Sequence, residues 1–173
     1  MSGTAVVYYS LPGETVAPGR KIVNLEKGHT AAAAETIARA VGADLYGLET
    51  VESYAADHMQ MVREAKEEFD RGIRRPLREY PDISGCDTVF VGFPNWFGTL
   101  PLPMAGFLER CDWRGKRLIP FVTSGGSGFA RSLDDLKKYC PGAEIAPGAA
   151  FLGHEVDSRT DEIAAWARSA LEG

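Results

Sequence analysis

Residues 88–98 have the sequence Thr88-Val89-Phe90-Val91-Gly92-Phe93-Pro94-Asn95-Trp96-Phe97-Gly98, an apolar run that ends in a short aromatic loop. A second apolar run, Leu118-Ile119-Pro120-Phe121-Val122, ends in Thr123-Ser124-Gly125-Gly126-Ser127-Gly128. Runs of Val, Ile, Leu and Phe without polar alternation are typical of parallel strands covered on both faces. Ligands bind such sheets just beyond the carboxyl ends of the strands. We therefore expect both loops to contribute to one binding site, with aromatic rings from the first and backbone amides from the second.

On either side of these two runs, strand-like and helix-like segments alternate along the chain. Strands are expected at 5–9, 44–49, 88–93, 118–122 and, more weakly, 143–151; helices are expected at 30–41, 55–70, from Pro101 or Pro103 to about 111, 129–139 and 158–171. Strict alternation predicts an α/β fold with a parallel sheet and helices on both faces. Five strands favour the shorter of the two common doubly wound strand orders, 2-1-3-4-5. We expect a single domain over residues 1–173.

Composition and charge exclude several classes of function. The chain has 173 residues, of which 45% are hydrophobic and 25% charged, as in ordinary globular domains. Its net charge of −5 argues against nucleic acid as a partner, because no excess of Lys and Arg is present to displace counterions. No apolar segment approaches the roughly 20 residues of a membrane span. No signal peptide is recognised and the three cysteines form no pattern, so a cytoplasmic location is expected.

Two segments compete as a phosphate-binding loop. Residues 10–15, Ser-Leu-Pro-Gly-Glu-Thr, match a Ser/Thr-x-x-Gly-x-Thr phosphate loop, but residues 16–19 cannot propagate a helix after them. A phosphate binds best at a helix N-terminus, which the sequence places at Gly28-His29-Thr30. We therefore interpret residues 11–27 as an insertion and expect Ser10 to converge with residues 28–30 on one phosphate. The alternative is that Thr30 only caps its helix.

Four motifs together are similar to the flavodoxin family: residues 8–10, 28–30, 92–98 and 123–128. The match is closest to a branch with a long first loop, and His29 departs from the small polar residue usual at its position. The resemblance implies bound FMN, with Trp96 and Phe97 beside the flavin ring and glycine amides at its edge. The expected cofactor-binding residues are Ser10, Gly28, His29, Thr30, Pro94, Asn95, Trp96, Phe97, Gly98, Ser124, Gly125, Gly126, Ser127 and Gly128.

Several other charged residues and histidines are interpreted as structural or solvated. The arginines around Pro76 are expected on a solvated face, although Arg75 is the alternative candidate for a phosphate contact, because related flavodoxin-like proteins carry an Arg-Pro pair here. His58 and His154 are interpreted as structural, because no acid or nucleophile lies at a catalytic spacing from either in the sequence. The other residues interpreted as solvated are Arg71, Arg74, Arg78, Glu64, Glu67 and Glu68.

The function expected from these observations is that of an FMN-binding, flavodoxin-like redox protein that carries electrons between partner proteins. The alternative is an FMN-dependent NAD(P)H oxidoreductase acting on quinones or similar acceptors. A third possibility, a binding module without flavin, is disfavoured because all three loops are present. No Ser-His-Asp or paired-carboxylate arrangement indicates hydrolysis, and no catalytic residue or metal ligand is identified.

Overall fold

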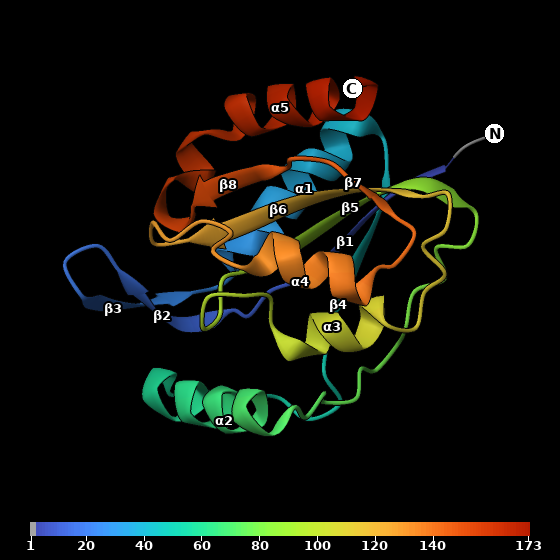
Figure 1. Cartoon of the computed structure of the whole chain (residues 1–173). Coiled ribbons are helices and arrows are strands. Elements are labelled where there is room, and N and C mark those ends of the chain that lie inside the picture. The colour runs from blue at the N-terminus through green and yellow to red at the C-terminus, as the bar shows by residue number, and fades with distance from the viewer. Residues whose placement is uncertain (1–2) are drawn as a thin grey trace.

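The computed structural model describes residues 3–173, which form a parallel sheet between two layers of helices (Figure 1). The sheet order is β4 (Asp44–Leu48), β1 (Gly3–Tyr9), β5 (Cys86–Pro94) and β6 (Arg117–Ser124), after which β7 (Glu144–Ile145) and β8 (Ala149–Leu152) both pair with β6. With β7 and β8 counted as one interrupted strand, the predicted order 2-1-3-4-5 is confirmed. The interruption falls at Pro147-Gly148, where proline cannot donate a ladder hydrogen bond.

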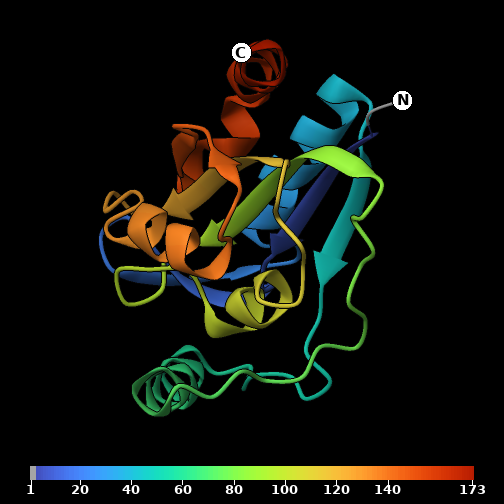
Figure 2. The ribbon, with the colours of Figure 1, turned by 45° about the vertical axis from the view of Figure 1, so that its right-hand side comes forward.

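Both faces of the sheet are buried, which explains the unbroken apolar runs. Val7 points to a core shared with α3 (Leu102–Leu108) and α4 (Ser132–Tyr139). Val6 points to the opposite core, shared with α1 (His29–Val41) and α5 (Thr160–Glu172). Figures 1 and 2 show these two helix pairs on opposite sides of the strands.

Helix α1 begins one residue before the predicted position and ends at the predicted glycine. Gly28 is its N-cap, with φ −62° and ψ 153°, and no side chain accepts from the free amides of the first turn. Gly42 ends the helix with φ 67°, the left-handed conformation that favours glycine. The helix therefore starts at residues 28–30, as predicted. It does not start after residues 10–15.

The segment between β1 and α1 forms an antiparallel hairpin that the sequence analysis did not anticipate. Its strands are β2 (Gly13–Ala17) and β3 (Lys21–Leu25), joined by the three-residue turn 18–20. Figure 1 shows this hairpin extending away from the sheet beyond the carboxyl end of β1. Its cross-strand pair Val16 and Ile22 is 50% and 56% exposed. The hairpin is thus placed to cover a ligand bound at the carboxyl edge of the sheet.

Helix α2 (His58–Arg71) stands apart from the sheet, at the bottom of Figures 1 and 2. Ala65 is its one buried residue. The Asp57 carboxylate caps its N-terminus by accepting from the Gln60 amide at 2.9 Å. A short 3₁₀ helix, η1 (Gly153–Ser158), follows β8. Within residues 3–173, no helix combines the length and apolarity needed to cross a membrane.

Candidate functional site

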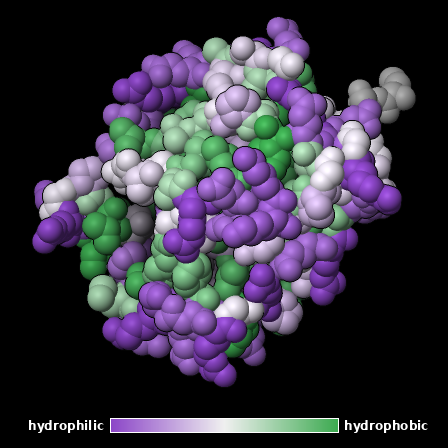
Figure 3. All heavy atoms as spheres, viewed as in Figure 1, coloured by the Kyte–Doolittle hydropathy of each residue, from purple (hydrophilic) through white to green (hydrophobic). Residues whose placement is uncertain are grey.

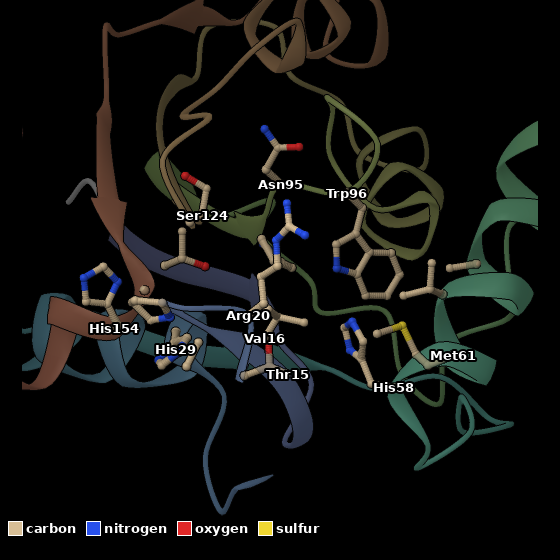
Figure 4. Close-up of a pocket in the computed structure, with 18 of the residues that line it drawn as sticks. Thr15, Val16, Arg20, His29, His58, Met61, Asn95, Trp96, Ser124 and His154 are labelled. Atoms are coloured by element: carbon tan, nitrogen blue, oxygen red, sulfur yellow. The ribbon is translucent and has the colours of Figure 1, made fainter. Parts of the chain in front are cut away.

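A cavity of about 700 Å³ lies at the carboxyl ends of β5 and β6. Its walls come from the β2–β3 hairpin, the first residue of α1, one side of α2, the loops after β5 and β6, and the start of η1 (Figure 4). Figure 3 shows a hollow beside the hairpin with hydrophobic residues on its sides. The size is typical of small-molecule and cofactor sites.

A tight turn after β5 presents two aromatic residues to this cavity. The backbone of Trp96 exchanges hydrogen bonds with that of Thr99, at 2.9 and 3.1 Å. The two central residues, Phe97 and Gly98, have φ values of 56° and 81°. Positive φ at both central positions defines a type I′ turn, in which glycine at the second position avoids strain. Gly98 therefore shapes the loop, while Trp96 and Phe97 line the cavity.

Asn95 joins the two loops that the sequence predicts at the site. Its backbone N–H donates to the Thr123 carbonyl at 3.0 Å. Its side-chain Nδ2 donates to the Gly128 carbonyl at 2.8 Å, and its Oδ1 accepts from the Gly98 N–H at 3.0 Å. The side chain thus fixes the relative position of the loops, in addition to lining the cavity.

Trp96 is held from behind by two tyrosines. Its ring packs edgewise against Tyr9, with centroids 5.6 Å apart and planes at 89°, and against Tyr54, at 5.5 Å and 82°. Phe97 instead packs on Phe69 of α2 at 5.5 Å, which attaches the loop to that helix. Since the remaining surface of the Trp96 indole lines the cavity, it forms a fixed aromatic platform there.

The loop after β6 is stabilised by hydrogen bonds between one of its side chains and its own backbone. Ser124 Oγ accepts from the N–H groups of Gly126 and Gly128, at 3.2 and 3.0 Å. These two amides, which the sequence suggested for a ligand, are therefore engaged within the loop in this structure. Gly125 lies on the cavity wall and is exposed.

The N-terminus of α1 forms the opposite end of the cavity. A Cβ at Gly28 would lie 2.1 Å from Ser10 Oγ, so only glycine permits the chain to pass so close to Ser10. Thr30 Oγ1 and Thr123 Oγ1 are hydrogen-bonded at 2.7 Å. Two hydroxyl groups that share one hydrogen bond retain one further donor between them. Because the first turn of α1 contains no acidic residue, its free amides and positive dipole favour an anion there.

All three histidines of the chain line the cavity. Burial lowers the pKa of His29, nearby His154 lowers it further, and Asp157 opposes both effects. The backbone N–H of His58 donates to Glu14 of the hairpin at 3.1 Å, while the Nδ1 of His58 is buried without a partner. His58 and His154, interpreted from the sequence as structural, therefore belong to the cavity wall.

The structure contradicts the solvated interpretation of Arg75 and its glutamates. The Arg75 guanidinium donates to Glu68 at 2.8 Å, lies 3.5 Å from Glu64, and stacks on Tyr54 at 3.7 Å from the ring centroid. The Arg75 side chain is only 15% exposed and is absent from the cavity wall. Arg75 therefore ties α2 to Tyr54, which supports Trp96. Its charge is already paired with the two glutamates.

The predicted site residues divide into two groups. Those that line the cavity are His29, Pro94, Asn95, Trp96, Phe97, Ser124 and Gly125. Those that lie next to it without lining it are Ser10, Gly28, Thr30, Gly98, Gly126, Ser127 and Gly128. The second group consists of residues that shape the loops or the start of α1.

Sequence reasoning missed two walls of the cavity. The hairpin contributes residues 15–20, and α2 contributes His58, Met61, Val62 and Ala65. A signal for the hairpin was present, because two β-prone runs flank Pro18-Gly19-Arg20, a short turn with glycine. Nothing in the sequence indicated that α2 would leave the sheet.

Comparisons with known proteins agree with this architecture. The flavodoxin family model matches residues 21–170. A candidate flavoprotein from Bacteroides uniformis ATCC 8492 shares 26% identity, with a TM-score of 0.75 and coverage of 96% of this chain and 98% of that one. A candidate flavoprotein from Bacteroides eggerthii DSM 20697 shares 28% identity, with a TM-score of 0.71 and coverage of 95% and 99%.

A more distant structure, a flavoprotein in complex with FMN from Lactobacillus acidophilus NCFM, has the same fold. It shares 20% identity and a TM-score of 0.67, with coverage of 91% of this chain and 98% of that one. No curated protein matches the chain.

Proposed function

The chain belongs to the flavodoxin family, and from this membership we propose that it binds FMN in the cavity and transfers electrons between redox partners. One observation carries the proposal. A single cavity connects the free N-terminus of α1 to the aromatic platform of Trp96. These are the two features that a ligand with a phosphate at one end and a flat ring at the other requires.

The phosphate end of FMN fits the start of α1. The first-turn amides, the glycine at position 28 and the spare hydroxyl donor of the Thr30–Thr123 pair together favour an anion. No Asp or Glu is among the residues that line the cavity, so no carboxylate opposes it there.

The ring end of FMN fits the loops after β5 and β6. Trp96 offers an aromatic surface whose orientation is set by Tyr9 and Tyr54. Gly125 offers exposed backbone beside it without a side chain to obstruct a ring edge. Bound FMN supplies one- and two-electron redox chemistry, while the protein sets its orientation and its electrostatic surroundings.

Within this class we propose the role of an electron carrier between partner proteins. Residues 125–127 are exposed next to the cavity, so a partner can approach one edge of the site. A second candidate role, an FMN-dependent NAD(P)H oxidoreductase acting on quinones, is favoured by one observation. Met61, Val62 and Ala65 of α2 form an apolar wall, which suits a small planar acceptor.

Two measurements test these proposals. The purified protein, reconstituted with FMN, is expected to show flavin absorbance bands and to quench FMN fluorescence on titration; a protein that takes up no FMN contradicts the proposed function. Steady-state oxidation of NADH or NADPH in the presence of a naphthoquinone then separates the roles. Negligible turnover without a separate reductase supports the carrier, and rapid turnover supports the oxidoreductase.

A further inference from the structure

The charges on the cavity wall are unusual for an acidic protein. The chain has a net charge of −5, yet the wall contains no Asp, Glu or Lys, and Arg20 is its one arginine. The other titratable groups on the wall are the three histidines. Among residues 3–173, Arg20 is therefore the one permanently charged residue on the cavity wall, where it is also exposed to solvent.

Arg20 is placed there by the conformation of the hairpin turn. It follows Gly19 in the turn between β2 and β3, and these two residues have φ values of 61° for Arg20 and 82° for Gly19. A left-handed conformation is uncommon for a residue with a long side chain. Figure 4 shows the Arg20 side chain projecting from the hairpin toward the loops that carry Asn95 and Ser124.

The Arg20 guanidinium makes no ion pair with any residue in the described part of the chain. Arg75, by contrast, is committed to Glu64 and Glu68. A guanidinium whose hydrogen-bond donors are unused is available to a ligand with oxygen or nitrogen acceptors. The phosphate end of the cavity is already served by the N-terminus of α1, so the ring end is where Arg20 adds something new.

We infer that Arg20 is a positioning and potential-setting residue for the flavin ring, which raises the reduction potential of bound FMN. This inference rests on the proposed function. When two electrons and one proton enter the oxidised, neutral ring, the ring gains one net negative charge. A nearby guanidinium stabilises that charge, and it does so more strongly in a partly enclosed cavity than in water. The oxidised ring gains less, because it has no net charge for Arg20 to attract.

The inference also gives the hairpin a function. The one aromatic residue of the loop after β6, Phe129, packs against the hydrophobic core and is not on the cavity wall, so it does not cover a ring opposite Trp96. The hairpin supplies Val16 and Arg20 to the cavity instead. The chain thereby replaces an aromatic cover with a cationic one, which favours the reduced cofactor.

The test compares Arg20→Gln, Arg20→Lys and the control Lys21→Gln, each saturated with FMN. Lys21 lies next to Arg20 in the chain, is exposed, and is not on the cavity wall, so it is matched in charge and position. Reduction potentials are measured by anaerobic dye equilibration near pH 8, where unperturbed histidines are neutral and do not contribute charge. FMN and riboflavin affinities of the oxidised proteins are measured by fluorescence.

Arg20→Gln is expected to weaken the binding of reduced FMN by about tenfold relative to oxidised FMN. For a two-electron couple this ratio corresponds to a potential lower by about 30 mV. Arg20→Lys should retain most of the wild-type potential, and Lys21→Gln should retain all of it.

Two results overturn the inference. One is a potential for Arg20→Gln that equals that of Lys21→Gln. The other is a selective loss of FMN affinity over riboflavin affinity without a change in potential, which identifies Arg20 as a phosphate ligand. Both differ from failure of the proposed function itself, in which the wild-type protein binds no FMN.

Discussion

The side-chain amide of Asn95 donates a 2.8 Å hydrogen bond to the carbonyl of Gly128, which links the loop after β5 to the loop after β6. The same side chain accepts from the Gly98 N–H at 3.0 Å. One residue thus holds the two loops in register. Positions on both loops therefore depend on Asn95, whether or not they contact a ligand themselves.

Replacing Asn95 by Ala is expected to loosen both loops. The substitution removes two hydrogen bonds, each with a net contribution of about 0.5–1.5 kcal/mol. FMN affinity should fall by roughly tenfold, and the melting temperature should fall with it. Asn95→Asp serves as the control, because its carboxylate can still accept from Gly98 but cannot donate to Gly128. If Asn95→Ala binds FMN as tightly as the wild type, the loops do not depend on this side chain.

Replacing Thr30 by Val is expected to weaken binding of the FMN phosphate more than binding of the flavin ring. The buried Thr123 hydroxyl loses its 2.7 Å partner, and an unsatisfied buried hydroxyl costs about 1–3 kcal/mol. FMN affinity should fall by more than riboflavin affinity, as measured by fluorescence titration of both ligands. Thr30→Ser retains the hydroxyl and should restore FMN binding. Equal losses for FMN and riboflavin would indicate that Thr30 acts on the fold and not on the phosphate.

Replacing Trp96 by Ala is expected to weaken the binding of FMN and of riboflavin equally, in contrast to Thr30→Val. The ring platform disappears, and aromatic stacking is worth about 0.5–1.5 kcal/mol beyond the area it buries. Affinities for FMN and riboflavin should therefore fall together. Trp96→Phe retains an aromatic face and should recover part of both. An unchanged riboflavin affinity in Trp96→Ala would place the ring elsewhere in the cavity.

Arg75 is expected to contribute to stability and not to phosphate binding. Arg75→Gln leaves Glu68, whose side chain is only 16% exposed, without its charged partner. Breaking a buried pair costs about 3–5 kcal/mol, and partial exposure here reduces that to about 2–3 kcal/mol. The control is Arg71→Gln, since Arg71 and its partner Glu67 are 66% and 68% exposed and such pairs contribute under about 1 kcal/mol. Urea unfolding measures both, and an unchanged ratio of FMN to riboflavin affinity in Arg75→Gln excludes a phosphate contact.

The sequence was sufficient to predict what depends on local chemistry. The break at residues 16–19 and the glycines at 28 and 42 correctly located α1, because capping and helix propensity act over a few residues. The apolar runs at 88–93 and 118–122 correctly located β5 and β6, since both faces of those strands are buried.

What depends on distant contacts could not be predicted in the same way. The solvated interpretation of Arg75 was wrong because its partners, Glu64 and Glu68, lie on a helix that packs away from the sheet. His58 and His154 are 96 residues apart in the chain, and only the tertiary fold brings both to one cavity. Their spacing in the sequence therefore carried no signal.

His29 predicts how the stability of the protein depends on pH. Burial lowers the pKa of His29 below its ordinary value, so the unfolded chain binds a proton at a pH where the folded protein does not. Stability should therefore rise with pH across the window from the lowered folded pKa to the ordinary value of 6.5, and be lost as the pH falls through that window. Thermal unfolding at several pH values between about 5 and 7.5 measures the slope. His29→Gln should flatten it, whereas His154→Gln, at an exposed position, should preserve most of it. If His29→Gln retains the full slope, another group is responsible for the acid sensitivity.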